Sequence, residues 1–173
     1  MQDLSAILMQ ASARVPAGYF QLPIDGGDPI YRERVYCYEL YHQMRCLWPA
    51  ATAYYLNGEV DKAAHPILRE LGADLVKPDL LVHKPGYMSG NHAVMEVKAC
   101  NAQAAGIQKD LQTLSLFRSR VGYERAIYLL FGYQAHAALE RVRSAARELP
   151  GLAPIELWVH HEPDQAATYC GDA

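Results

Sequence analysis

The spacing of apolar and polar residues predicts alternating helices and strands along most of the chain. Over 104–118, Ile107, Leu111, Leu114 and Phe117 recur at helical spacing, which predicts an amphipathic helix with one buried stripe. The stretch 125–131 is an unbroken apolar run, which is typical of a strand covered on both faces. The same reasoning predicts helices over 3–14, 31–47, 65–71 and 134–148, and strands over 53–60, 78–84, 92–98 and 154–160.

The segments between these elements carry turn and loop residues. Gly and Pro in 15–29 predict a long connection, and 85–91 predicts a turn-rich loop. The final residues, 162–173, predict a loose tail. The resulting order is helix, three strands, helix, strand, helix, strand. Antiparallel strands followed by crossover helices predict an α/β fold with a mixed central sheet flanked by helices.

Composition narrows the class of protein. The 173 residues suit a single domain, 1–173, and the apolar content of about half with a net charge of −3 excludes general disorder. We expect a cytoplasmic protein without membrane contact, because no run approaches the ~20 apolar residues of a membrane span and the N-terminal stretch lacks the basic start of a secretory leader. Four scattered cysteines without a CxxC pair indicate reduced thiols rather than a zinc knuckle.

Two short motifs on the second and third strands carry the clearest chemistry. Pro78-Asp79 and Glu96-Val97-Lys98 flank a loop centred near residue 87 or 88. Symmetric pairing about that centre makes facing positions add to about 175, so Asp79 lies opposite Glu96, with Cβ atoms about 5 Å apart. Lys98, two positions further on, points to the same face. The opposite face then supplies core residues: Leu80, Val82, Met95 and Val97.

Two carboxylates held this close repel each other unless a cation lies between them or one is protonated. Hard oxygen ligands suit Mg²⁺, with Mn²⁺ as a substitute. A neighbouring ammonium can then hold or activate a water beside the metal. Asp79, Glu96 and Lys98 together therefore outline a metal-dependent hydrolytic site.

This pattern resembles the PD-(D/E)XK nuclease superfamily, also called restriction-endonuclease-like. The matching residues are Pro78-Asp79 and Glu96-Val97-Lys98, and the predicted element order over about 31–131 is similar to the αβββαβ core of that family. The resemblance implies a Mg²⁺-dependent deoxyribonuclease that hydrolyses phosphodiester bonds in DNA. Asp79 and Glu96 would bind the metal, and Lys98 would position the attacking water and stabilise charge on the phosphate.

The helix over 31–47 offers a third acid. Its apolar stripe consists of Tyr36, Leu40, Met44 and Leu47, and Glu39 lies within about 60° of the centre of that stripe, whereas Arg34, Tyr38, Tyr41 and Arg45 lie opposite. Many members of the resembled family carry a metal-site Glu on this helix, which makes Glu39 the candidate. The alternative is that Glu39 is half-exposed and pairs with Arg32 or Arg45. Glu33 is disfavoured, because in the first turn it serves the helix dipole.

Three further residues are weaker candidates. Gln108 and Lys109 begin the helix after the Lys98 strand, where the resembled family often offers a substrate-binding residue, although a solvated helix start explains them equally well. Glu59, in a Glu59-Val60-Asp61-Lys62 run that has one residue too many for an ExK motif, could face the site from the first strand.

Two alternatives to the enzyme stay open. One is an inactive member of the same fold that binds nucleic acid or protein, which the acidic net charge favours. The other is a small α/β protein unrelated to DNA. A homodimer is also left open, since cleavage of two strands by so small a domain needs two active sites. Zinc-protease and nucleotide-binding motifs are absent from the sequence.

Overall fold

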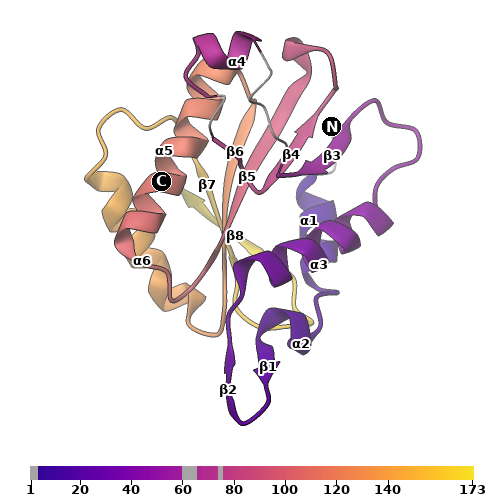
Figure 1. Cartoon of the computed structure of the whole chain (residues 1–173), viewed down its shortest axis with the longest axis vertical. Helices are drawn as coiled ribbons and strands as arrows, with labels where there is room; N and C mark the ends of the chain where they lie inside the picture. Colours follow the sequence, from indigo (N-terminus) through magenta and orange to yellow (C-terminus); the bar gives the residue numbers. More distant parts are fainter. Residues whose placement is uncertain (1–3, 60–65, 74–75) are drawn as a thin grey trace.

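A six-stranded mixed sheet forms the centre of the molecule. The computed structural model describes residues 4–59, 66–73 and 76–173. The strands lie in chain order, and β3, β4 and β5 are antiparallel, β5, β6 and β7 are parallel, and β8 returns antiparallel to β7 (Figure 1). Their bounds are β3 Tyr55–Gly58, β4 Leu80–His83, β5 Asn91–Ala99, β6 Arg125–Phe131, β7 Glu156–His160 and β8 Thr168–Asp172.

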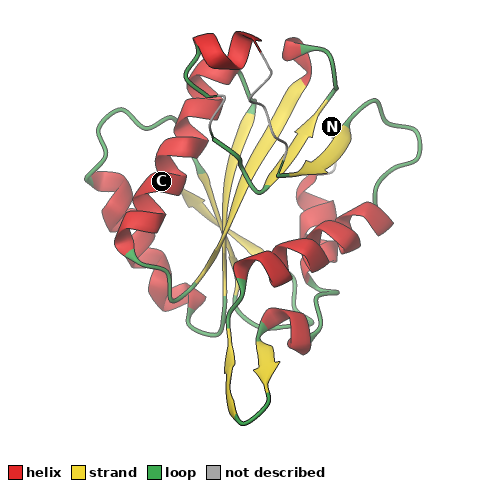
Figure 2. Cartoon of the chain, in the orientation of Figure 1, coloured by secondary structure: helices red, strands yellow, loops and turns green. Residues whose placement is uncertain are grey.

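Helices cover both faces of this sheet (Figure 2). One face packs against α1 (Leu4–Ser12), α2 (Ala17–Phe20) and α3 (Glu33–Cys46). The other packs against α4 (Pro66–Glu70), α5 (Ala104–Leu116) and α6 (Ala135–Arg147), with α5 continued by a π-helical turn, η2 (Phe117–Val121). The predicted α/β fold with a mixed, helix-flanked sheet is confirmed.

Alternating side chains of the central strands fill the two cores. On β6, Ile127 and Leu129 join the core beneath α1 and α3, whereas Tyr128 and Leu130 join the core beneath α5 and α6. Each face excludes water, which is why an unbroken apolar run suits this strand. On α3, Tyr36, Leu40 and Met44 are fully buried, as their helical spacing predicts.

Two segments differ from the sequence expectation. Within 15–29 the chain forms α2 and a small hairpin, β1 (Leu22–Ile24) paired with β2 (Gly27–Ile30), rather than a plain connection. Asp25-Gly26 is the turn signal that the sequence analysis missed; Gly26 has a φ of +73°, a conformation that glycine adopts without strain.

The predicted loose tail, 162–173, is wrong for its second half, which forms the edge strand β8. The Arg143 guanidinium donates to the Cys170 carbonyl at 2.8 Å, and the Trp158 and Tyr169 rings lie 5.7 Å apart. An edge strand half open to solvent tolerates the polar composition that made this segment look loose. A 3₁₀ turn, η1 (Met88–Gly90), lies in the loop predicted over 85–91. In the described part of the chain, no helix has the length and apolar character needed to cross a membrane.

Candidate active site

The β4–β5 hairpin brings Asp79 and Glu96 together. Leu80 pairs with Met95, Leu81 with Val94, and Val82 with Ala93, which is the register predicted from the sequence. A bulge lies between Val82 and His83, on the loop side, and so leaves the pairing near Asp79 unchanged. The Asp79 carboxylate (Oδ2) accepts the Val97 N–H at 2.7 Å, which fixes this side chain against β5.

The two carboxyl groups share a hydrogen bond in a poorly hydrated place. Glu96 is only 6% exposed. Burial, followed by the charges of Asp79 and Asp110, raises the pKa of Glu96 well above its ordinary value. Burial also raises the pKa of Asp79, although hydrogen bonds from the Val97 N–H and from Glu96 oppose this. Of the two carboxyl groups, Glu96 is the one whose surroundings favour the protonated form more strongly, and in that form it can donate to Asp79.

Lys98 lies between two further carboxylates. Its Nζ is 2.8 Å from Asp110 Oδ2 on α5 and 3.1 Å from Glu33 Oε2 at the start of α3. Burial lowers the pKa of Lys98, but the hydrogen bond and charge of Asp110 and the charge of Glu33 outweigh it and leave the pKa above its ordinary value. Lys98 is therefore a fixed positive charge rather than a base at neutral pH.

A cavity of about 570 Å³ opens over these groups. Asp79, Glu96, Lys98 and Asp110 contribute its acidic and basic wall, and the cationic side chains Lys77 and Lys109 also line it. The remaining lining residues are Val76, Gln112, Thr113 and Leu116. The cavity thus lies between the β4–β5 end of the sheet and α5, and it offers both oxygen ligands for a cation and cations for a phosphate.

A buried hydroxyl lies beside this carboxylate cluster. Tyr128 on β6 is the register neighbour of Glu96 and is fully buried. Within the described residues its hydroxyl has no hydrogen-bond partner. Burial, and then the charges of Asp110, Glu33 and Glu96, raise its pKa. An unpaired polar group at this position suits a site that holds further polar atoms, such as metal-bound waters, when it is loaded.

The structure places the two α3 acids differently from the sequence expectation. Glu33 reaches the site, with Oε2 on Lys98 and Oε1 accepting the Ala99 N–H at 3.3 Å. Glu39, the candidate metal ligand, instead accepts a hydrogen bond from Gln43 at 2.7 Å, one turn along the same helix. Glu33, and not Glu39, is therefore the α3 acid that contacts Lys98, and the metal-ligand role expected for Glu39 stays a prediction.

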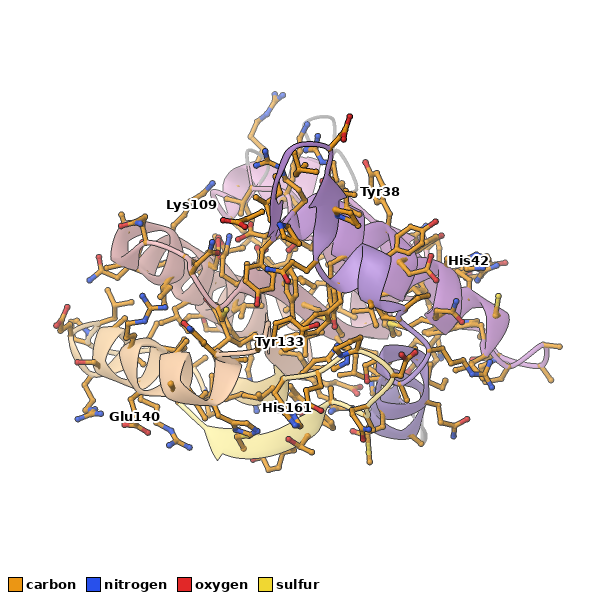
Figure 3. All side chains as sticks on the ribbon, turned by 90° about the horizontal axis from the view of Figure 1, so that it is seen from below. Tyr38, His42, Lys109, Tyr133, Glu140 and His161 are labelled. Atoms are coloured by element: carbon orange, nitrogen blue, oxygen red, sulfur yellow. The ribbon has the colours of Figure 1, made fainter. Side chains whose placement is uncertain are left out.

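Of the weaker candidates, one lines the cavity and two have partners elsewhere. Lys109 lines the cavity, whereas Gln108 donates to Glu148 at 3.1 Å. Glu59 pairs with Arg34 at 3.4 Å, and its N–H donates to the Asp79 carbonyl. Val60, Asp61 and Lys62, the rest of that run, lie outside the described residues. Figure 3 shows Lys109 on α5 and Tyr38 on α3 toward the same side of the molecule, with Glu140 and His161 on the opposite side.

Sequence reasoning missed Asp110. It follows Ile107 by three residues and precedes Leu114 by four, so it occupies the buried stripe of α5 and is only 6% exposed. An acid on an apolar stripe needs a partner, and this was the available signal. Glu33 carried no comparable signal, because an acid in the first turn of a helix is explained by the dipole alone.

The donor set fits a hard divalent cation. Asp79 and Glu96 provide carboxylate oxygens, which Mg²⁺ and Mn²⁺ prefer. No cluster of three or more His, Cys, Asp or Glu side chains among the described residues is arranged to hold a metal ion. Mg²⁺ commonly binds through one or two carboxylates and completes its shell with water and substrate phosphate, so a carboxylate pair in an open cavity suffices.

Comparison with known proteins assigns no function to this chain, so the function must be inferred from the site. No protein-family model and no curated protein sequence matches the chain. Among solved structures, it is similar to SfsA of Pyrococcus furiosus in complex with Ca²⁺, with 13% identity and a TM-score of 0.38 over 88% of this chain and 74% of that one. A likeness at this level assigns neither a family nor an activity.

Proposed function

We propose that this chain is a divalent-metal-dependent nuclease that hydrolyses phosphodiester bonds in DNA. The observation that supports the proposal most directly is the juxtaposition of Asp79 and Glu96 across the hairpin, with Lys98 in the same cavity wall. Burial raises the pKa values of both carboxyl groups, and a divalent ion between them would balance their charges.

In this proposal Asp79 and Glu96 hold Mg²⁺, or Mn²⁺ in its place. The ion, when bound, supplies Lewis-acid polarisation of the phosphate and of a water. The Val97 N–H keeps Asp79 oriented toward the cavity, so that little reorganisation precedes binding. The water oxygen adds to phosphorus and the water gives up a proton to solvent, while the ester P–O bond breaks and the departing oxygen takes up a proton.

Lys98 acts as a charged group in this reaction. Because Asp110 and Glu33 keep it protonated, it donates hydrogen bonds to the water or to a phosphate oxygen and stabilises the charge that develops there. Lys77 and Lys109 line the same cavity and favour a phosphate locally, although the whole chain is slightly acidic. DNA as the substrate is thus compatible with the charge of this cavity.

The test is Mg²⁺-dependent cleavage of single-stranded, duplex and branched DNA by the wild type and three variants. Lys98→Ala should cleave about 10²-fold more slowly while still binding Mn²⁺, because the lost charge acts mainly in the transition state. Asp79→Ala should lose Mn²⁺ binding and cleavage together. Lys84→Ala removes a lysine at the loop end of the same hairpin, where its ammonium lies over the Tyr54 ring, and should cleave like the wild type.

Chelation of the metal by EDTA should stop cleavage by the wild type. Cleavage that persists equally in Asp79→Ala and Lys98→Ala would identify a contaminating nuclease and contradict the proposal. A wild type that binds DNA but cleaves no substrate would favour the inactive, nucleic-acid-binding member of this fold.

A further inference from the structure

The outer face of α3 carries a row of aromatic and cationic side chains. Arg34, Tyr38, Tyr41 and Arg45 recur at helical spacing, opposite the buried side of the helix, and are called here the α3 stripe. Tyr38 is 61% exposed, so most of its ring is open to a ligand. Tyr41 is half-buried, because it packs against the core and its hydroxyl donates to the Leu56 carbonyl at 3.4 Å, so the fold accounts for Tyr41 but not for the exposed Tyr38.

A second cavity, of about 330 Å³, joins the α3 stripe to the candidate active site. Its walls are Cys37, Tyr38 and Tyr41 from α3, and Gly58, Glu59, Asp79 and Leu80 from the sheet. Asp79 lines both this cavity and the larger one that holds Glu96 and Lys98. The two cavities thus meet at one of the proposed metal ligands, with α3 on one side and α5 on the other.

The chemistry of the α3 stripe matches an unpaired nucleotide chain. Bases stack on aromatic rings whatever their sequence, and guanidinium groups bind phosphates. Arg34 and Arg45 flank the two tyrosines along the helix. Glu59 also belongs to this wall, but its ion pair with Arg34 at 3.4 Å reduces its repulsion of phosphates. In a duplex the bases are already stacked on their neighbours, so their faces cannot reach the rings.

We propose that the α3 stripe and its cavity bind unpaired bases next to the phosphate that is cleaved, so that the substrate is single-stranded DNA or a single-stranded segment of a larger DNA. This inference rests on the proposed nuclease function and adds the class of substrate. Tyr38 supplies the stacking surface, and Asp79 is the point at which the bound strand passes from the α3 stripe to the metal site.

Binding of a short fluorescein-labelled oligothymidylate, followed by anisotropy in EDTA so that no cleavage occurs, tests the inference. Tyr38→Ala should weaken binding about tenfold, the usual scale for loss of one stacked base, whereas Tyr38→Phe should bind like the wild type because the ring is kept. Tyr87→Ala is the matched control: Tyr87 is 70% exposed and lies in the loop at the other end of the hairpin.

Two further ligands separate stacking from phosphate binding. An abasic oligonucleotide of the same length should bind wild type and Tyr38→Ala equally, since it has no bases to stack. A blunt duplex should bind more weakly than the single strand and should not respond to Tyr38→Ala. The cleavage assay should show the same preference for single strands.

The outcomes distinguish the inference from the function on which it rests. Metal-dependent cleavage that requires Asp79, combined with equal single-strand binding by Tyr38→Ala and wild type, would overturn the inference and leave the nuclease intact. A preference for blunt duplex would do the same. Absence of both DNA binding and cleavage would overturn both proposals, and the tyrosines would then mark a protein-binding face.

Discussion

Lys98 is surrounded by more acid than it can neutralise. Glu33 and Asp110 lie 3.1 and 2.8 Å from its ammonium, and Asp79 and Glu96 line the same cavity. One positive charge thus faces four carboxyl groups. The raised pKa of Glu96 favours its neutral form, which lowers this excess, and a bound divalent cation would offset it further. The role of each acid should therefore be visible when its charge alone is removed.

Glu33 is expected to position Lys98. Glu33→Gln keeps an oxygen for the Ala99 N–H but removes the charge that holds the ammonium. We expect kcat to fall about tenfold with KM for DNA unchanged, the scale of a lost hydrogen bond between charged groups. Glu39→Gln is the matched control and should cleave like the wild type. If Glu39→Gln instead lost Mn²⁺ binding, Glu39 would be the metal ligand that the sequence analysis expected.

We expect Glu96 to lower the free energy of unfolding at neutral pH, although the protein needs it for metal binding. Its raised pKa means that its contribution to stability is fully present below its ordinary pKa of 4.5 and is lost as the pH rises through the higher pKa of the folded state. Glu96→Gln stays neutral at every pH. The free energy of unfolding should therefore exceed that of the wild type by about 1–2 kcal/mol at neutral pH, while Mn²⁺ binding is lost.

Urea denaturation between about pH 5 and pH 8 measures this effect. The difference in free energy of unfolding between Glu96→Gln and the wild type should grow with pH. Glu39→Gln, which removes a half-buried carboxylate bonded to Gln43 on α3, controls for the loss of an acid elsewhere. An advantage for Glu96→Gln that does not change with pH would show that the protonation of Glu96 is not its cause.

The residues of the site could be predicted from the sequence only where strand register decides them. Asp79, Glu96 and Lys98 follow from one loop centre and the two-residue period of a strand. The choice between Glu33 and Glu39 could not be predicted in this way. A helical wheel gives the direction of a side chain, but it does not tell which turn of the helix approaches the end of β5. That distance depends on packing between α3 and the sheet.

Among the elements, β8 shows how distant segments complete the sheet. Ser12, at the end of α1, donates through its hydroxyl to the Met9 carbonyl and accepts the N–H of Ala167, just before β8, at 2.8 Å. Both Ser12 and Ala167 are fully buried. The last strand is thus tied to the first helix, although the two are far apart in the sequence.

Ser12→Ala should therefore destabilise the protein by about 1–3 kcal/mol, because it leaves the buried Ala167 N–H without an acceptor. The urea midpoint should fall without a change in the denaturant slope. Ser119→Ala, which removes an exposed hydroxyl that donates to the Ser115 carbonyl one turn earlier, should change the free energy of unfolding by less than about 0.5 kcal/mol. An equal loss of stability in the two variants would show that the hydrogen bond between Ser12 and Ala167 does not stabilise the protein.

The elements with strong local patterns were predictable, and those that depend on distant partners were not. The run on β6 and the stripe on α5 carry their own periodicity, so their predicted spans agree closely with β6 (Arg125–Phe131) and α5 (Ala104–Leu116). β8 is polar and pairs with β7 through backbone groups, which any sequence can supply. The short strands β1 and β2 likewise have no buried face of their own.

At the scale of the whole molecule, the candidate site lies where three layers meet. The helices α3 and α5 lie on opposite faces of the sheet (Figure 1). Glu33 from α3 and Asp110 from α5 both contact Lys98 near the end of β5. Asp79 and Glu96 add the hairpin at the same end. The surroundings of Lys98 therefore exist only when both helical layers are packed on the sheet. Asp79 and Glu96 meet only across two paired strands of this sheet, so metal binding should be linked to global folding rather than to one loop.

This linkage predicts that Mn²⁺ stabilises the whole domain. A ligand that binds only the folded state adds about 2.7 kcal/mol at one hundred times its Kd. For a domain of this length, each 1 kcal/mol corresponds to a rise in Tm of about 2–4 °C, so saturating Mn²⁺ should raise Tm by roughly 5–11 °C. Differential scanning fluorimetry over a Mn²⁺ titration measures the shift, which should follow a one-site curve and reverse with EDTA. Asp79→Ala should show no shift, whereas Lys98→Ala should retain most of it, because the lysine acts on the substrate and not on the ion. An equal rise in Tm for wild type and Asp79→Ala would place the stabilising ion elsewhere on the protein and would remove the main support for a metal site at the hairpin.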